Sequence, residues 1–169
     1  LVQVAKMLGA RVLATCSTDD KAERVREAGA DEVILYSKTN FVAEVNRITG
    51  GSGVDVAYDS VGKSTWEGSM DCLRPRGMLV LFGNASGPVP GIEPLTLSKK
   101  GSLFLTRPSL LHYVATREDL LHRAGSLFKW ISSGKVQIHI GVTLPLSEAS
   151  EAQRRLAARE TTGKILLLP

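Results

Sequence analysis

Hydrophobic and polar positions in the first half of the chain follow two alternating patterns. Four stretches have apolar residues three or four positions apart and predict amphipathic helices: residues 1–8, 21–28, 40–48 and 65–73. Each is followed by a glycine-containing turn and a short apolar run that predicts a strand: residues 11–16, 32–36, 54–59 and 77–83. Strands that are apolar on both faces and alternate with helices predict an α/β fold, a doubly wound parallel sheet covered on both sides.

The pattern changes after Gly83. Residues 84–94 contain too many glycines and prolines for a helix or a central strand, so they predict a long surface loop. Further on we expect a strand at residues 103–107, a helix at 117–132, a strand at 136–144, a helix at 148–160 and a strand at 165–168. The length of 169 residues fits one domain.

The composition is that of a globular protein, with 43% hydrophobic and 22% charged residues. No apolar run approaches the roughly 20 residues that span a bilayer, so we expect no membrane segment. The first residues do not resemble a signal peptide, and we expect the chain to be the interior of a longer protein. Cys16 and Cys72 are too few for a disulfide framework and predict reduced, buried thiols in a cytoplasmic protein.

The charged residues argue against two classes of ligand. The net charge is +4, but the basic residues are scattered, which argues against nucleic-acid binding and suits a small phosphorylated ligand better. The three histidines, His112, His122 and His139, have no second histidine at helical spacing. We therefore expect no metal site.

Candidate ligand-binding residues follow the strands, because a doubly wound sheet binds its ligand at the carboxyl ends of its strands. The segments that follow the strands are rich in small, polar and aromatic side chains. They are residues 15–18, 36–38, 59–62 and 82–87. An NAD site normally has an acid at the end of its second strand, but Cys16, Ser17 and Thr18 stand there, with Lys21 shortly after. Lys21 would suit a 2′-phosphate. The alternative is that Ser17 or Thr18 merely caps a helix and Lys21 is solvated.

The glycine-rich turn of a dinucleotide site is missing, because the chain begins inside the helix that should follow it. Residues 50–53 are rich in glycine but follow a helix and precede a strand, so they are interpreted as a turn. We expect the absent first strand to lie between residues 11–16 and 54–59. Without it, the edges of both strands are unpaired.

Several short segments, taken in order, resemble one known family: residues 8–10, 28–30, 48–51, 58–62, 82–84, 86–87 and 106–110. Over residues 1–169 the chain resembles the C-terminal half of the zinc-independent quinone oxidoreductases, the zeta-crystallin-like branch of the medium-chain dehydrogenase/reductase superfamily. The resemblance implies a Rossmann-type domain of an NADPH-dependent enzyme that passes hydride to a quinone or a similar activated alkene or carbonyl, without zinc. It also implies that residues 136–169 return toward a catalytic domain upstream of this sequence.

The same resemblance assigns cofactor-binding residues. Lys21 and Tyr36, with Ser17 or Thr18, match positions at the 2′-phosphate, and Ser60 matches the position under the adenine ribose. Residues along the nicotinamide half are Phe82, Gly83 and Asn84, and Arg159 corresponds to another cofactor-proximal residue. No catalytic residue is assigned. Tyr58 and Asp59 are interpreted as core and helix-contact residues instead.

The resemblance also implies a homodimer through the strand at residues 103–107, an apolar edge followed by Pro108. Alternatively, the loop at residues 87–94 or the helix from Arg117 covers that edge and leaves a monomer. Two other functions remain as alternatives. An AdoMet-dependent methyltransferase would need an acid after the second strand, and a crystallin-like or RNA-binding protein would need basic residues interleaved with aromatic ones for RNA.

Overall fold

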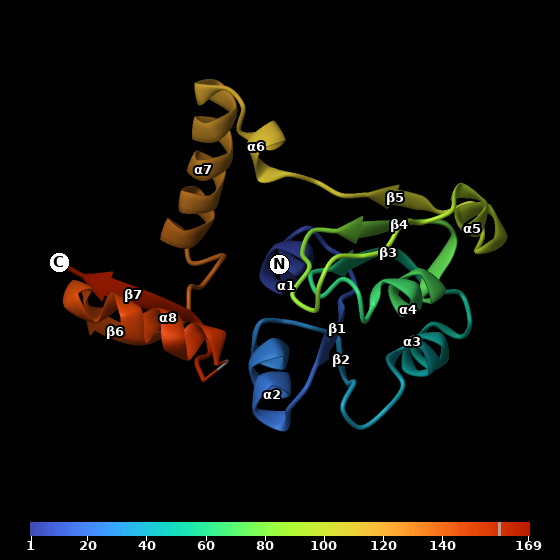
Figure 1. Ribbon diagram of the computed structural model, residues 1–169, viewed down its shortest axis with the longest axis horizontal. Coiled ribbons are helices and arrows are strands. Elements are labelled where there is room, and N and C mark those ends of the chain that lie inside the picture. Colours follow the sequence, from blue (N-terminus) through green and yellow to red (C-terminus); the bar gives the residue numbers. More distant parts are fainter. Residues whose placement is uncertain (159) are drawn as a thin grey trace. The chain divides into compact units, whose positions relative to one another are not determined.

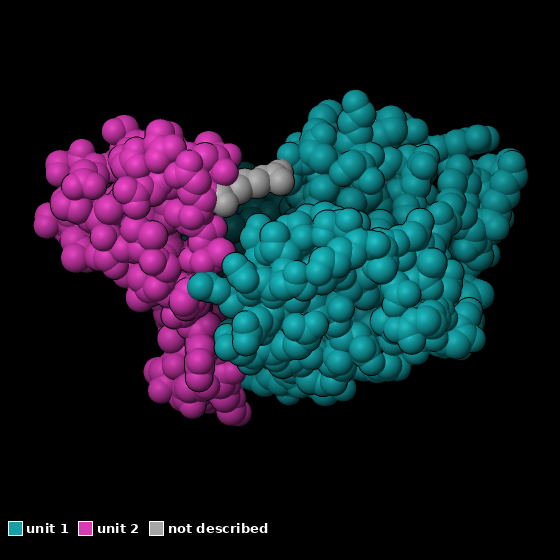
Figure 2. All heavy atoms as spheres, turned by 90° about the horizontal axis from the view of Figure 1, so that it is seen from below, with its two compact units in different colours: residues 1–121 teal, residues 122–169 magenta. Residues whose placement is uncertain are grey.

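The computed structural model describes residues 1–158 and 160–169 (Figure 1). Its elements are α1 (Val2–Met7), β1 (Leu13–Cys16), α2 (Asp19–Glu27), β2 (Glu32–Leu35), α3 (Phe41–Thr49), β3 (Val54–Asp59), α4 (Trp66–Asp71), β4 (Leu73–Leu81), α5 (Pro94–Lys99), β5 (Phe104–Thr106), α6 (Leu110–Tyr113), α7 (Arg117–Ser132), β6 (Ile140–Pro145), the 3₁₀ helix η1 (Leu146–Glu148), α8 (Ala149–Ala157) and β7 (Lys164–Leu168). The chain divides into two compact units, Leu1–Leu121 and His122–Pro169, which Figure 2 colours separately.

The first unit contains two parallel sheets. One pairs β1 with β2 and the other has the order β3-β4-β5. The predicted parallel α/β class is confirmed. Within the described residues, β1 pairs only with β2 and β3 only with β4, so the edges expected to flank an absent first strand have no partner strand.

Helices in the first unit begin and end where the sequence places polar caps and glycines. Thr18 and Asn40 cap α2 and α3 with side-chain oxygens that accept the backbone N–H groups of Lys21 and Ala43. Gly50 ends α3 in the left-handed region, at φ +61°. The predicted boundaries of α1 to α4 therefore all lie within two residues of the observed ones.

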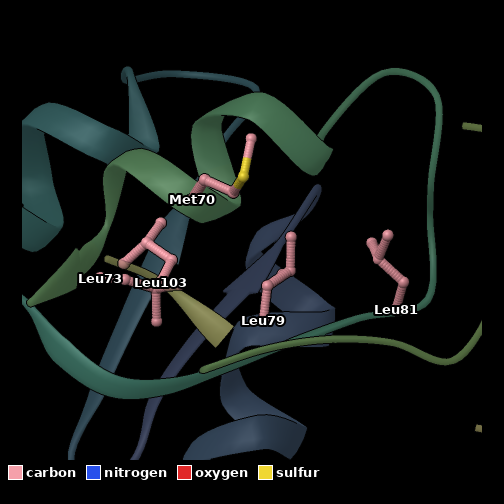
Figure 3. Packing of buried hydrophobic residues seen from close by; sticks show 5 residues of the cluster. All are labelled: Met70, Leu73, Leu79, Leu81 and Leu103. Carbon is pink, nitrogen blue, oxygen red and sulfur yellow. The ribbon is translucent and has the colours of Figure 1, made fainter. Parts of the chain in front are cut away.

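The main core of the first unit lies between α4 and the β3-β4-β5 sheet (Figure 3). Its buried side chains are Met70, Leu73, Leu79, Leu81 and Leu103. A second cluster joins Ile34 of β2 to Val45 of α3 and to Cys72, which follows α4. Each buried aliphatic side chain contributes about 1.5–3 kcal/mol to folding. These contacts fix α3 and α4 against the sheets, and thus the loops at the ends of β2 and β3.

The opposite face of the β3-β4-β5 sheet is open within the described residues. Val56 is 40% exposed, Met78 37% and Phe104 57%, although these three residues are paired neighbours on adjacent strands. Within the first unit, α4 packs on the other face, where Met70 meets Leu79 and Leu81.

Two short α-helices, α5 and α6, and the 3₁₀ helix η1 were not predicted. α5 begins at Pro94, where the sequence predicts the end of a loop, because proline is tolerated in the first turn of a helix. α6 covers only Leu110–Tyr113. The prediction of α7 at residues 117–132 is confirmed.

The second unit holds a parallel pair of strands, β6 and β7, connected through η1 and α8. β6 begins at Ile140, four residues after the predicted start, and α8 ends at Ala157 instead of residue 160. Glu151 of α8 binds the guanidinium groups of Arg154 and Arg155, which lower its pKa to about 2. No helix of the described residues is long and apolar enough to cross a bilayer.

Candidate functional site

Asp59, the last residue of β3, organises the loop that follows the strand. Its side chain is 4% exposed and accepts four hydrogen bonds. Oδ1 receives the backbone N–H groups of Val61 at 2.8 Å and Gly62 at 3.0 Å. Oδ2 receives the hydroxyls of Thr65 at 2.7 Å and Ser69 at 2.8 Å. The prediction that Asp59 is a structural, helix-contacting residue is confirmed.

The four donors also keep Asp59 charged. Burial raises the pKa of its carboxyl group, but the hydrogen bonds from Gly62, Thr65, Ser69 and Val61 together lower the pKa below its ordinary value. The ionised carboxylate thus ties the turn after β3 to the first turns of α4. This leaves no free lone pair directed toward a reacting group.

A second loop, after β4, binds to the first along its backbone. The N–H groups of Ala85 and Ser86 donate to the carbonyl oxygens of Ser60 and Val61, at 3.2 and 2.8 Å. The hydroxyl of Ser86 also donates to Val61 O and accepts from the N–H of Ser64. We call residues 59–65 and 82–87 together the double loop.

Two glycines allow the two halves of the double loop to touch. A Cβ on Gly83 would lie 2.4 Å from the carbonyl oxygen of Ser60, and one on Gly62 would lie 2.8 Å from that of Gly87. Gly62 also has a φ of +87°, a conformation that side chains disfavour. The backbone of the double loop is therefore closely packed as well as hydrogen-bonded.

The double loop brings together four of the residues predicted to bind the cofactor: Ser60, Phe82, Gly83 and Asn84. Ser60 and Asn84 are exposed, and Phe82 is 46% exposed. The Phe82 ring meets the Tyr58 ring edge-on, with the centroids 6.5 Å apart. Because Tyr58 is 56% exposed, its interpretation as a core residue is wrong. Its alternating position on β3 places it on the open face of the sheet.

A hollow of about 440 Å³ lies beside the double loop. Gly83 and Asn84 line one part of it, and Leu105 and Arg107 line another. The Arg107 guanidinium donates to the carbonyl oxygen of Leu81 at 3.0 Å, which connects the end of β5 to the end of β4. This hollow gives the exposed Asn84 side chain a partly apolar setting.

The carboxyl ends of β1 and β2 form a second group of candidate residues, which we call the β1–β2 end: residues 16–21 and 36–38. The Tyr36 N–H donates to Cys16 O at 3.1 Å, and the Ser37 hydroxyl donates to Ser17 O at 2.7 Å. The parallel register thus places the predicted residues Ser17, Thr18, Lys21 and Tyr36 in one region. Tyr36 is 51% exposed.

The alternative interpretation of Thr18 as a helix cap is confirmed, since its Oγ1 accepts the N–H of Lys21 at 3.4 Å. The side chain of Lys21 is half-buried and has no ion-pair partner among the described residues. Lys38 and Asp19 form an ion pair at 2.8 Å across the β1–β2 end. Sequence reasoning did not single out this pair, although Lys38 directly follows the strand-end residues Tyr36 and Ser37.

Arg159, the remaining predicted cofactor residue, lies outside the described residues. Both cysteines, Cys16 and Cys72, are buried and free, as expected. Burial raises the pKa of Cys72 to about 11, with a smaller contribution from the charge of Asp71, so this thiol is protonated at neutral pH.

Comparison with known proteins identifies the family. The family model for zinc-binding dehydrogenases matches residues 1–127. The chain belongs to this family. Among the described residues, no group of three or more His, Cys, Asp or Glu side chains could hold a metal ion. The residues present thus do not supply the ligand set for the zinc that the family name implies.

Relatives within the family include quinone oxidoreductases. The chain is 49% identical over 167 residues to the quinone oxidoreductase of Pseudomonas aeruginosa, covering 99% of this chain and 51% of the relative. It is 45% identical, with a TM-score of 0.93, to the crystal structure of Escherichia coli quinone oxidoreductase complexed with NADPH, covering 99% of this chain and 52% of that one. It is also 44% identical over 172 residues to a 2-haloacrylate reductase of a Burkholderia species, covering all of this chain and 51% of the relative.

These similarities confirm the resemblance to quinone oxidoreductases and the Rossmann-type fold. The chain spans about half the length of the curated relatives that it matches.

Proposed function

We propose that the chain is the cofactor-binding part of an NADPH-dependent quinone oxidoreductase. The observation that carries this proposal is the similarity, at a TM-score of 0.93 and 45% identity, to the Escherichia coli quinone oxidoreductase that was solved with NADPH. When bound, NADPH supplies the hydride that reduces the substrate. The part of this chain is to bind the cofactor and orient it.

The residues at the strand ends fit the two halves of such a cofactor. At the β1–β2 end, Lys21 and Tyr36 with Ser17 and Thr18 would hold the 2′-phosphate, because Lys21 is a cation with no ion-pair partner among the described residues. In the double loop, Ser60 would support the adenine ribose. The nicotinamide half would lie along Phe82, Gly83 and Asn84. Arg159 remains part of the proposal by resemblance only.

The substrate would be a quinone or another small electrophile. Reduction of an activated alkene is a second candidate, favoured by the 44% identity to a 2-haloacrylate reductase over the whole chain. Both reactions add a hydride to a carbon–carbon or carbonyl π-system that an electron-withdrawing group polarises. We propose that neither uses zinc, and no residue of this chain is assigned to proton transfer.

The test of this function compares the two nicotinamide cofactors. We expect NADPH to bind more tightly than NADH, because the β1–β2 end offers Lys21 to a 2′-phosphate. Titration monitored by the fluorescence of the reduced nicotinamide measures both affinities. Equal affinity for the two cofactors would contradict the proposal. We expect no quinone reduction by the 169-residue chain alone, because the sequence contains no glycine-rich pyrophosphate turn.

We further propose that the protein forms a homodimer through β5. This strand stands last in the order β3-β4-β5 and pairs only with β4 among the described residues, and Phe104 is 57% exposed. Such an edge can pair with a second copy about a two-fold axis. Phe104→Lys should dissociate the dimer, whereas Leu8→Lys, at a residue 74% exposed on another element, should not. A light-scattering mass that Phe104→Lys leaves unchanged would exclude β5 from the interface.

Two expectations from the sequence stay proposals. One is that residues 1–169 act as one NADPH-binding domain whose residues 136–169 return toward a catalytic domain. The other is a cytoplasmic location, which the two free, buried cysteines support because a reducing compartment preserves thiols.

A further inference from the structure

The ion pair between Asp19 and Lys38 crosses the β1–β2 end. Lys38 Nζ lies 2.8 Å from Oδ2 and 3.1 Å from Oδ1 of Asp19. Asp19 is the first residue of α2, and Lys38 lies three residues beyond the end of β2. Both side chains are well exposed, at 73% for Asp19 and 59% for Lys38. An exposed pair of this kind is weak and can rearrange when a stronger partner arrives.

The charges around this pair decide what the β1–β2 end attracts. The hydrogen bond and the charge of Lys38 lower the pKa of Asp19, with a smaller contribution from Arg26, so Asp19 is anionic at neutral pH. Asp20 adds a second carboxylate in the same turn. Lys21 and Arg26 are further cations in this region. Without Lys38, the local charge would shift toward the two carboxylates, which disfavours a phosphate.

We propose that Lys38 is a specificity-determining residue for the 2′-phosphate of the cofactor, and that Asp19 is the internal carboxylate with which this phosphate competes. The inference rests on the proposed function. In the free protein Asp19 holds the Lys38 ammonium at the strand end. A 2′-phosphate carries more negative charge than a carboxylate and engages the same ammonium together with Lys21. A 2′-hydroxyl cannot compete, so the Asp19–Lys38 pair stays closed when NADH is offered.

The competition assigns opposite effects to the two partners. Removing the charge of Lys38 exposes the carboxylates and removes a phosphate contact, which weakens binding of a 2′-phosphate. Removing the charge of Asp19 frees Lys38, which strengthens it. Since Lys38 itself contacts the phosphate, the double variant should bind less tightly than the Asp19 variant alone.

The experiment uses two soluble probes that differ only in the 2′-phosphate, adenosine 2′,5′-bisphosphate and adenosine 5′-monophosphate. Both are titrated into the wild-type chain, Lys38→Met, Asp19→Asn and the double variant, and binding is followed by NMR chemical-shift changes. Lys100→Met is the matched control, because Lys100 forms an ion pair with Asp71 away from the strand ends. No turnover is needed, and the ratio of the two affinities reports the 2′-phosphate alone, because both probes carry the same 5′-phosphate.

We expect Lys38→Met to lower the affinity for the bisphosphate by roughly three- to tenfold. Asp19→Asn should raise the same affinity by about two- to threefold. The affinity for the monophosphate should stay within about twofold in both variants, and Lys100→Met should change neither probe. The effects should shrink in 0.5 M salt, because exposed charges are screened. A structural role of Lys38 would alter both probes alike.

The experiment distinguishes failure of the proposed function from failure of the role of Lys38. If the wild-type chain does not prefer the bisphosphate, the β1–β2 end is not a 2′-phosphate site and the proposed function itself fails. If the wild type prefers the bisphosphate but Lys38→Met changes both probes equally or neither, the role of Lys38 is wrong while the function stands. A double variant equal to Asp19→Asn would likewise refute a direct contact between Lys38 and the phosphate.

Discussion

The double loop and the β1–β2 end both follow parallel strands, yet they are built in different ways. In the double loop, a carboxylate that is 4% exposed collects four hydrogen bonds, and two loops touch through glycine backbones. At the β1–β2 end, Tyr36, Asp19 and Lys38 are exposed, and an ion pair joins Asp19 to Lys38. One region is fixed by buried polar contacts, and the other by surface charge.

The difference matches what each half of the proposed cofactor requires. Hydride transfer depends on the position of the nicotinamide ring, and a small displacement lowers the rate strongly. A rigid backbone such as that of the double loop serves this need. Recognition of a 2′-phosphate depends on charge, which long exposed side chains can supply without a fixed backbone.

The largest effect should come from Asp59→Ala. This variant leaves two backbone N–H groups and two hydroxyls without their acceptor, and each unsatisfied buried group costs about 1–3 kcal/mol. We expect a loss of at least about 3 kcal/mol in the free energy of unfolding, measured by urea denaturation. Asp19→Ala, the matched change at the β1–β2 end, should cost clearly less, because its ion pair with Lys38 is exposed to solvent. Equal losses would mean that the two regions are not built differently.

The next effect concerns affinity instead of stability. Lys21→Ala should lower the affinity for NADPH by roughly ten- to 150-fold, which corresponds to about 1.5–3 kcal/mol for a charge-assisted contact to phosphate. The affinity for NADH should stay nearly unchanged, and so should the unfolding midpoint, because Lys21 has no ion-pair partner among the described residues. Isothermal titration with both cofactors measures the two affinities. An equal loss for NADPH and NADH would remove Lys21 from the 2′-phosphate site.

A smaller effect should follow Ser86→Ala. Its hydroxyl joins the two halves of the double loop through Ser64 and Val61, and a hydrogen bond of this kind contributes about 0.5–1.5 kcal/mol. The same change at Ser37, whose hydroxyl donates to Ser17 O at the β1–β2 end, serves as the comparison. We expect Ser86→Ala to lower the affinities for NADPH and NADH equally, because it loosens a loop that does not contact the 2′-phosphate in the proposed complex. A selective loss of NADPH would contradict this.

The smallest effect should appear in the acid dependence of stability. The pKa of Asp59 is lower in the folded than in the unfolded chain, so its contribution is complete above the unfolded pKa of about 4. It is lost as the pH falls through the folded value. The difference in unfolding free energy between wild type and Asp59→Asn should therefore be constant from pH 7 to about 5 and shrink below about 4. If the difference in unfolding free energy instead grows as the pH falls, the pKa of Asp59 is not lowered by folding.

Much of the fold could be predicted from the sequence because local signals are strong here. The glycine after α3 and the caps Thr18 and Asn40 place helix boundaries, and the apolar runs place β1, β2, β3 and β5. β4 begins at Leu73, four residues before its predicted start. α5 was missed because its first residue is Pro94, which ends loops as readily as it begins helices. The open face of the β3-β4-β5 sheet could not be foreseen, since an apolar residue such as Val56 looks the same in sequence whether or not a helix covers it.

The sequence predicts which residues lie at the candidate site but not which of them contact one another. The rule that ligands bind at strand ends selects Lys21, Tyr36 and the residues after β4. The pairing of Asp19 with Lys38 depends on the register of β1 and β2, which brings together residues 19 positions apart. The exposure of Tyr58 likewise depends on which face of the sheet remains open.

The contact between Gly83 and Ser60 has a consequence for engineering. Because a single added methyl group at Gly83 would meet a carbonyl oxygen at 2.4 Å, neither loop can be redesigned against an unchanged partner. Loops transplanted from a relative with another substrate should be tolerated only when residues 59–65 and 82–87 are exchanged together. The two segments, which a helix and a strand separate in the sequence, would then have to be replaced as a single unit.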